Sequence, residues 1–336
     1  MLMGFLLTNC PMSEPIKTIV IALGGNAILS KGDPGDVEQQ TLNMELACRQ
    51  LMPLIRSRNR IVITHGNGPQ VGNLLIQQEE SVPGVPQQPL DICVGMTQGQ
   101  IGTMLQQVLH KILQSNDIQR EVVTLVSHFV VAEDDLDFLQ PSKPIGPFLD
   151  AVEKRQNEAC GHTVMEVSPG SDRPYRRSVP SPIPLRLLER RSLRALVNEG
   201  TIVIAGGGGG IPVVLEPDGS YRRVEAVIDK DLAGEKLGES VDADIYIVLT
   251  NVESVSLDFG TDQQRPIHSA NVSQVKDYFQ AGQFALGSMA PKILGCIQFV
   301  EFGGERAVIT GLEWAEEALA GRAGTQILPD GCIRSV

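Results

Sequence analysis

The stretch that decides the fold is "IVIALGGNAI", residues 19–28, in which five apolar residues run directly into two glycines and an asparagine. A short apolar run rich in β-branched residues predicts a buried strand. Glycines at the exit of a strand let backbone N–H groups approach another group closely. The stretch therefore predicts a strand that ends at Gly24, Gly25 and Asn26, with something held against that turn.

Strand-like runs alternate with helical patterns along most of the chain. The strand-like runs are "TIVIALG", "RIVITHG", "EVVTLVSHFVV", "TIVIAGGGGGIPVV", "DADIYIVLTNV", "RAVITGL" and "GTQILP". The helical patterns cover residues 37–58, 70–80, 97–115, 189–200, 230–238, 273–280, 290–302 and 313–320. Such alternation predicts an α/β fold, with a mainly parallel sheet that carries helices on both faces.

One segment interrupts this alternation. Residues 133–184 are rich in Pro, Gly, Asp and Arg, and both of their flanks belong to the same strand–helix pattern. We therefore expect a single domain over residues 16–336 with an inserted subdomain at about 132–180. Residues 1–15 are expected to be a disordered extension that can be removed, and Met12 is an alternative start of translation.

Composition excludes several classes of function. The net charge is −12 and no basic segment stands out, which argues against nucleic-acid binding. The six cysteines form no C-x-x-C pair, so they indicate reduced thiols and a cytoplasmic location. No stretch is long enough to span a bilayer. An anionic small substrate stays possible, because a few local cations decide a binding site.

Glycine-rich turns follow two further strand-like runs, at 66–68 (Gly-Asn-Gly) and at 206–210 (five glycines). Ligands of open α/β sheets bind beyond the carboxyl ends of the strands, where glycine turns and helix N-termini hold anions. One such turn could be only a tight connection, but three predict an anion site. The G-x-x-x-x-G-K-[ST] and G-x-G-x-x-G motifs are absent, which excludes a P-loop and argues against a dinucleotide site.

Three of the nine lysines lie in unusual contexts. Lys143 stands between prolines in "PSKPIGP", Lys230 between Asp229 and Asp231 at a predicted helix start, and Lys292 at another helix start. A cation at a helix N-terminus opposes the helix dipole, so this placement suggests that an anion arrives there. Each lysine taken alone is also compatible with an ordinary surface position.

Three other features of the sequence give weaker indications of function. His65 follows a strand end and is expected to be a hydrogen-bonded structural histidine, because no paired ligand spacing accompanies it. The acidic cluster at 133–137 is expected to be solvated. Small and apolar residues at helical spacing over 90–109 indicate either a packed helix or a self-association face.

The motifs in this order resemble those of the carbamate kinases, members of the amino acid kinase family. The matching segments span about residues 18–328 and include "ALGGNA", "THGNGPQVGNLL", "PSKPIGPF", "AGGGGGIPVV", "VEAVIDKDLAGEKLG", "DADIYIVLTNVESV" and "FALGSMAPK". The resemblance implies an open, mostly parallel eight-stranded sheet between helical layers with a small protruding subdomain. It also implies a homodimer, Mg²⁺ with ATP or ADP, and the reaction ATP + carbamate = ADP + carbamoyl phosphate, used in catabolism to make ATP.

The resemblance further assigns roles to residues. The N-terminal part would serve the carbamate and phosphate, and the part from about residue 200 to 336 the nucleotide. The implied catalytic residues are Lys143, Lys230, Asp231, Lys292 and Asp229; the implied phosphate and carbamate turns are Gly24, Gly25, Asn26, Gly66, Asn67 and Gly68; the implied nucleotide contacts are Gly206, Gly207, Gly208, Met289, Lys230 and Lys292. Asp231, with Asp229 beside it, would orient the lysines and is the candidate Mg²⁺ ligand, although Mg²⁺ is expected mainly to accompany ATP.

Most amino acid kinases carry a lysine where this chain has Ala22, and in carbamate kinases a subdomain lysine, here Lys143, replaces it. We expect that lysine to lie far from the 24–26 turn until the subdomain closes over substrate. Two positions depart from the family pattern. Ala290 replaces a glycine, at a cost of roughly 1 kcal/mol if the backbone there has positive φ, and Ile183 stands where lysine is common.

Two alternatives remain open. One is a kinase of another small carboxylate or carbamate-like acid, and the other is a nucleotide-sensing relative without activity. Retention of Lys143, Lys230 and Lys292 together with the two aspartates argues against a sensor, which has no need of transfer machinery.

Overall fold

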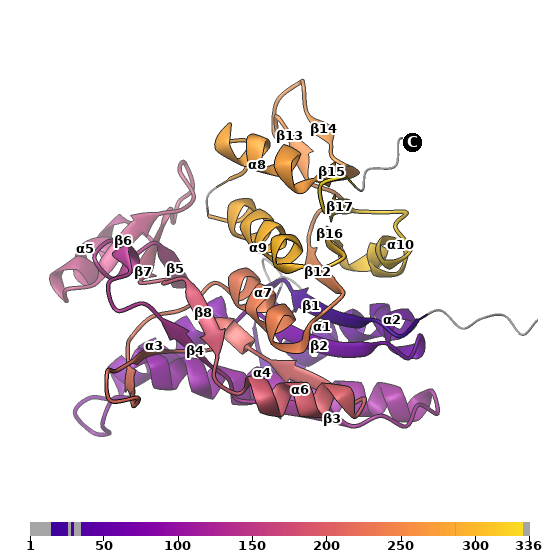
Figure 1. Cartoon of the computed structure of the whole chain (residues 1–336). Helices are drawn as coiled ribbons and strands as arrows, with labels where there is room; N and C mark the ends of the chain where they lie inside the picture. The colour runs from indigo at the N-terminus through magenta and orange to yellow at the C-terminus, as the bar shows by residue number, and fades with distance from the viewer. Residues whose placement is uncertain (1–14, 26–27, 30–34, 286, 332–336) are drawn as a thin grey trace, which may run out of the picture.

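The computed structural model describes residues 15–25, 28–29, 35–285 and 287–331. Its main sheet has eight strands in the order β15-β17-β16-β12-β1-β2-β9-β3 (Figure 1). The pairings are parallel except that between β16 and β17, so the expected mainly parallel sheet is confirmed. The strands are β1 (Thr18–Leu23), β2 (Arg60–His65), β3 (Val122–Leu125), β9 (Ile202–Ala205), β12 (Ile245–Thr250), β15 (Ser269–Asn271), β16 (Arg306–Gly311) and β17 (Thr325–Leu328).

Helices cover both faces of this sheet. One buried cluster joins the sheet to α1 (Val37–Gln50), α2 (Met52–Arg56), α4 (Leu90–Ser115) and α10 (Ala315–Leu319). The other joins it to α6 (Arg190–Asn198), α7 (Lys230–Val241), α8 (Val272–Gln280) and α9 (Met289–Phe302). None of the described helices is long and apolar enough to cross a membrane.

Alternation along β1 shows why this sequence forms a central strand. Ile19, Ile21 and Leu23 enter the cluster with α1 and α4, whereas Val20 and Ala22 enter the cluster with α7 and α9. All six β1 residues are buried, as expected where helices cover both faces of a parallel sheet. Ala22 therefore faces the layer from which Lys230 and Lys292 come.

The run "EVVTLVSHFVV", expected as one strand, is two strands in different sheets. β3 ends at Leu125, and β4 (His128–Val131) joins a four-stranded sheet with β8 (Pro184–Leu187), β10 (Ile211–Leu215) and β11 (Tyr221–Arg223). The chain turns at Ser127, whose backbone N–H and C=O both bond the Gln98 side chain at 2.9 and 3.1 Å. The Ser127 carbonyl also accepts a hydrogen bond from the Ile211 N–H at 2.9 Å. Contacts with α4 and β10 thus hold the turn, and no local pattern in the sequence reveals them.

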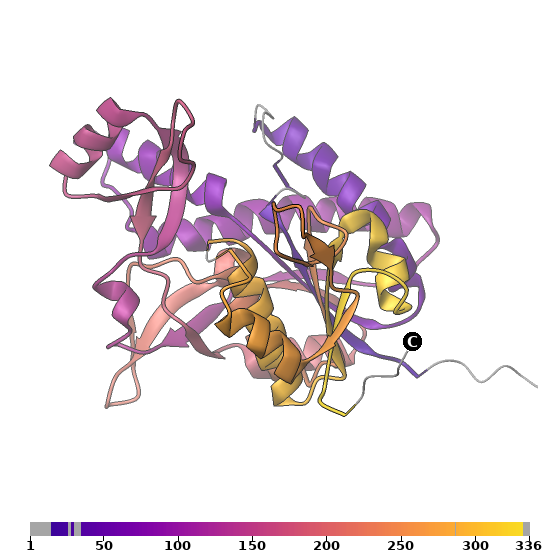
Figure 2. The ribbon, with the colours of Figure 1, turned by 90° about the horizontal axis from the view of Figure 1, so that it is seen from above.

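The inserted subdomain projects from the main body, as Figure 1 and Figure 2 both show. It is an antiparallel sheet of β5 (Lys143–Leu149), β7 (Tyr175–Val179) and β6 (Thr163–Glu166), with α5 (Ala151–Ala159) beside it. The acidic cluster before it is not simply solvated. Asp137 accepts hydrogen bonds from Ser142 and from the Ser181 N–H, and Asp135 accepts one from the Ile183 N–H. The cluster therefore joins the segment that enters the subdomain to the segment that leaves it.

Two helical expectations need correction. The 37–58 pattern is two helices. Leu51 ends α1, and α2 begins at Met52 with Pro53 in its first turn, where proline is favourable. The pattern at 97–115 is the second part of α4, which begins at Leu90. The remaining helices agree with the sequence patterns within a few residues, and α3 covers Gly68–Glu80. The expectation about residues 1–15 lies outside the described residues, apart from Pro15.

Candidate active site

Four neighbouring strands, β12, β1, β2 and β9, end at the same edge of the sheet. The glycine turns after β1, β2 and β9 therefore meet there, as the sequence predicts for parallel strands. A cavity of about 240 Å³ opens between them. Its lining comprises Gly25, Gly66, Asn67, Gly68, Pro69, Lys143, Ile145, Gly208, Val227, Ile228, Asp229, Lys230, Asp231, Gly287, Ser288 and Lys292. Gly24 lies just behind, and its N–H donates to the Leu249 carbonyl at 3.0 Å; Asn26 lies outside the described residues.

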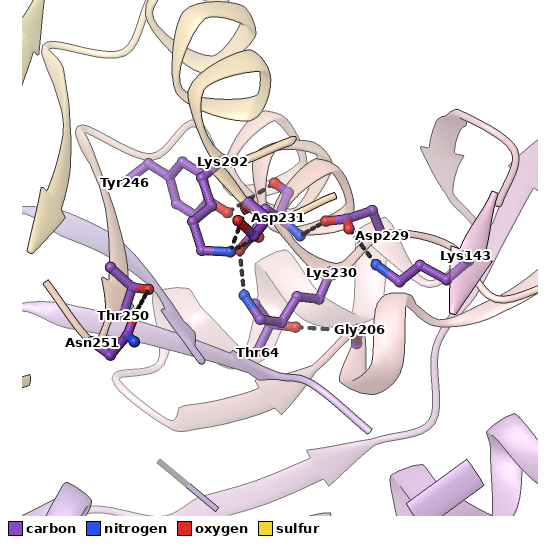
Figure 3. Close-up of polar contacts among 11 residues, drawn as sticks. Thr64, Lys143, Gly206, Asp229, Lys230, Asp231, Tyr246, Thr250, Asn251 and Lys292 are labelled. Atoms are coloured by element: carbon purple, nitrogen blue, oxygen red, sulfur yellow. Dashed lines mark hydrogen bonds and ion pairs between the residues drawn. The ribbon is translucent and has the colours of Figure 1, made fainter. Parts of the chain in front are cut away.

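The three lysines singled out from the sequence all reach this cavity, and two aspartates hold them (Figure 3). Lys230 and Lys292 both pair with Asp231, the latter at 3.1 Å between Nζ and Oδ2. Lys143 pairs with Asp229. The ammonium groups therefore come from α7, from α9 and from the subdomain strand β5, and they converge on one aspartate pair at the start of α7.

Three helices begin at this cavity. Asn67 is the N-cap of α3, Asp229 is the N-cap of α7 and accepts a hydrogen bond from the Asp231 N–H at 2.8 Å, and Ser288 precedes α9. Each helix N-terminus carries a partial positive charge and unpaired N–H groups. Together with three ammonium groups, they make the cavity suited to a highly charged anion such as a polyphosphate.

Burial and neighbouring charges set the ionisation of these groups. Burial by itself raises the pKa of Asp229, but Lys143 and Lys230 outweigh it and hold that pKa well below its usual range. Burial lowers the pKa of Lys230 despite the nearby Asp231. Burial also acts to lower the pKa of Lys292, yet Asp231 and Asp229 outweigh it and raise that pKa. Asp231 and Asp229 therefore oppose the effect of burial on Lys230 and Lys292. In such a poorly solvated site, charges act strongly on a bound anion.

We expected Lys143 to lie far from the glycine turns before substrate binds, and this expectation is wrong for the structure described here. It lines the same cavity as Gly25 and Gly66, and its ammonium reaches the N-cap of α7. Ile145, two residues further along β5, packs into a buried cluster with Val71 and Leu75 of α3. The structure thus shows the subdomain docked on the main body with Lys143 already in the site.

A second cavity of about 460 Å³ adjoins the first, and Ser288 lines both. It combines apolar side chains with polar ones and includes the predicted Met289. Its other residues are Asn251, Val252, Ser254, Val255, Ser256, Asp258, Phe259, Thr261, Gly282, Gln283, Phe284, Ala285 and Ser288. We did not single these out as site residues, although "LTNV" ends a buried strand at the edge where such ligands bind.

The five-glycine turn lies beside the smaller of the two cavities. Gly208 lines that cavity, opposite Asn67. Gly206 and Gly207 are buried behind it, where the Gly206 carbonyl accepts a hydrogen bond from Thr64 at 3.0 Å (Figure 3). The turn therefore supports the phosphate side of the site rather than the larger cavity.

Two smaller expectations are settled here. His65 is a buried structural histidine, and its Nδ1 lies 3.0 Å from the Gly66 carbonyl oxygen. Burial lowers its pKa to about 4. Ala290 lies in the first turn of α9 and has no positive φ, so alanine causes no backbone strain at that position.

The chain is similar to known proteins over nearly its whole length. The model of the amino acid kinase family matches residues 17–311. The carbamate kinase of Pyrococcus furiosus is 46% identical over 316 residues, which are 93% of this chain and 99% of that protein. Carbamate kinase 2 of Staphylococcus aureus is 46% identical over 315 residues, with the same shares covered. The solved structure of carbamate kinase from Giardia lamblia bound to AMP-PNP is 34% identical, has a TM-score of 0.86 and matches over 95% of this chain and 100% of that chain. The chain therefore belongs to the amino acid kinase family, in its carbamate kinase branch.

Proposed function

We propose that this protein is a carbamate kinase, which transfers a phosphoryl group reversibly between ATP and carbamate. The observation that carries the proposal is the convergence of Lys143, Lys230 and Lys292 on one cavity that adjoins a larger, partly apolar one. The relatives named above are carbamate kinases, and one of them binds the ATP analogue AMP-PNP. The larger cavity would then hold the nucleoside, and the smaller one the transferring group.

The proposed mechanism is in-line transfer. An oxygen of the ADP β-phosphate forms a bond to the phosphorus of carbamoyl phosphate, while the bond from phosphorus to the carbamate oxygen breaks. Carbamate leaves as an anion, so no strong general base is needed. Phosphoryl transfer depends mainly on positioning and on stabilisation of charge. Lys230 and Lys292 would neutralise nucleotide phosphates, Lys143 the transferring group, and Asp229 and Asp231 would orient the lysines.

We propose that Mg²⁺ enters as part of the nucleotide substrate. Among the residues that the structure describes, no group of three or more metal-ligating side chains is found. The two carboxylates in the cavity already pair with lysines. Mg²⁺ commonly keeps several waters and binds through substrate phosphates with one or two carboxylates, which suits this arrangement.

We further propose a cytoplasmic homodimer that uses its activity to make ATP in catabolism. The exposed positions of α4 from Met96 to Gln107 support self-association: Met96, Gln100, Thr103 and Gln107 carry no charge, in a chain with a net charge of −12. The free cysteines among the described residues agree with a reducing compartment.

Formation of ATP from ADP and carbamoyl phosphate, coupled to hexokinase and glucose-6-phosphate dehydrogenase, tests the proposal. We expect rapid, enzyme-dependent ATP formation with carbamoyl phosphate and much slower formation with acetyl phosphate. Preference for acetyl phosphate would favour a kinase of another small carboxylate. Tight ADP binding without ATP formation from either donor would indicate a nucleotide sensor.

A further inference from the structure

We propose that Gly72 is a positioning residue, which sets how deeply the subdomain delivers Lys143 into the site; this inference rests on the proposed function. Gly72 lies in α3, the helix whose N-terminus lines the cavity. Gly146 lies on β5, three residues after Lys143. The two backbones meet without a side chain between them, and we call this contact the glycine seat.

The glycine seat leaves no room for a side chain on α3. A Cβ atom added at Gly72 would lie 2.0 Å from the Gly146 Cα and 2.3 Å from its nitrogen. Both neighbours are backbone atoms, so no rotamer change can relieve the overlap. Real Cβ contacts stay beyond 3.0 Å, so an alanine must push β5 away from α3 by at least about 1 Å.

The subdomain holds its side of the seat rigidly. Gly146 has φ +70°, a conformation that favours glycine, and its carbonyl accepts hydrogen bonds from the Arg176 guanidinium at 2.9 and 2.6 Å. Ile145 beside it packs into the buried cluster with Val71 and Leu75. The pairing of β5 with β7 is regular from Lys143 to Ile145 and irregular between Ile145 and Leu149. A displacement at Gly146 would therefore be passed on to Lys143 through the regularly paired part of β5.

An ion pair joins the subdomain to α3 at a second place, further along the helix. The Arg177 guanidinium of β7 donates to Glu79 Oε1 at 2.6 Å, and His162 lies 3.6 Å from the same oxygen. The glycine seat and this pair lie about two turns apart along α3. Together they define both the distance and the orientation of the subdomain.

The test is a double-mutant cycle with Gly72→Ala and Lys143→Ala, measured by ATP formation in the wild-type assay described above. A misplacement of 1 Å at a reacting group can cost about a hundredfold in rate. We expect Gly72→Ala to lower kcat roughly 10- to 100-fold with KM for ADP within about twofold. Alanine favours helix more than glycine, so a weakened α3 cannot explain such a loss. Asn73→Ala, an exposed neighbour on α3, is the matched control and should match the wild type.

The cycle separates a positioning role from a structural one. If Gly72 acts through Lys143, Gly72→Ala should have no further effect in the Lys143→Ala background. A full additional loss there, or an unchanged kcat in Gly72→Ala alone, would overturn the inference. A wild type that makes no ATP from either acyl phosphate would instead overturn the proposed function.

A second variant decides the question if Gly72→Ala does not fold. Glu79→Ala removes the ion pair at the edge of the interface and leaves the glycine seat intact. Because a partly exposed pair contributes up to about 1 kcal/mol, we expect kcat to fall by roughly two- to fivefold. That loss should vanish in the Lys143→Ala background, and an unchanged kcat or a persistent loss would overturn the inference.

Discussion

Asp231 is buried between two lysines that come from different helices, and it connects three parts of the site. Its carboxylate pairs with Lys230 and Lys292, its backbone N–H donates to Asp229, and its carbonyl accepts a hydrogen bond from Tyr246 at 2.8 Å. A buried carboxylate is tolerated only when it is paired in this way. The two lysines are thus held in place before any phosphate arrives.

We predict that Lys230→Ala and Lys292→Ala each lower kcat at least tenfold, because each removes a cation that would face developing phosphate charge. Steady-state assays at saturating ADP and carbamoyl phosphate measure this. Lys276→Ala is the matched control, since Lys276 pairs with Glu301 on an exposed part of the surface. A wild-type kcat in either site variant, with unchanged melting, would show that its assigned role is wrong.

His65 gives a prediction about pH. Its pKa of about 4 in the folded protein lies below the ordinary value of 6.5, so the unfolded chain binds more protons between these values. Folding stability should therefore be intact above pH 6.5 and fall as the pH drops toward 4, by about 3 kcal/mol from this group. Urea unfolding of the wild type and His65→Asn at pH 7 and pH 5 tests this. The variant should lose less stability between the two pH values, and an equal loss would contradict the assignment.

At the level of residues, the sequence contexts of Lys230 and Lys292 predicted their place at helix starts, whereas Lys143 lies in the cavity and not far from it as expected. Their placement at helix starts and between prolines has a local cause, which a single sequence displays. The positions of Gly206 and Gly207 were harder to predict from the sequence. Whether a glycine faces a ligand or packs behind the site depends on which residue lies opposite it in the fold. Here those neighbours are Thr64 and His65, on a strand about 140 residues earlier in the chain.

At the scale of elements, the alternation of strands and helices predicted a mainly parallel sheet with helical layers on both faces, and the resemblance to the carbamate kinases implied its eight strands. It failed at β3 and β4, where the apolar pattern continues while the chain changes sheets. Gln98 of α4 makes that change possible by bonding both backbone groups of Ser127. Such long-range side-chain contacts cannot be seen in local periodicity.

The base of the subdomain gives a prediction at this scale. Asp137 bonds Ser142 on the chain that enters the subdomain and the Ser181 N–H on the chain that leaves it. We predict that Asp137→Ala makes the subdomain more sensitive to limited proteolysis and lowers kcat, while the main domain melts as before. Asp134→Ala, an exposed neighbour, is the control. Equal proteolysis of the two variants would show that the acidic cluster does not fasten the subdomain.

At the scale of the whole molecule, we predict a homodimer at micromolar concentration, with the uncharged exposed positions of α4 in the interface. Thr103 lies near the middle of that set, so Thr103→Lys should place a charge in the contact and shift the protein toward monomer. Sedimentation velocity measures both states. A wild type that sediments as a monomer would exclude the dimer, and a dimeric variant would place the interface elsewhere.

The account depends most on one feature of the whole molecule. The core strand β1 has the buried Ala22 before its glycine turn, and a separate subdomain supplies Lys143 to the cavity at that turn. Because Lys143 would contact the transferring group rather than the nucleotide, its loss should affect the rate and not ADP binding.

The most direct test is to measure, for Lys143→Ala, both kcat for ATP formation from carbamoyl phosphate and Kd for ADP by calorimetry. We predict that kcat falls at least a hundredfold, a barrier increase of about 2.7 kcal/mol or more, while Kd for ADP stays within about twofold. An unchanged kcat, or a loss of ADP affinity as large as the loss of rate, would contradict the account.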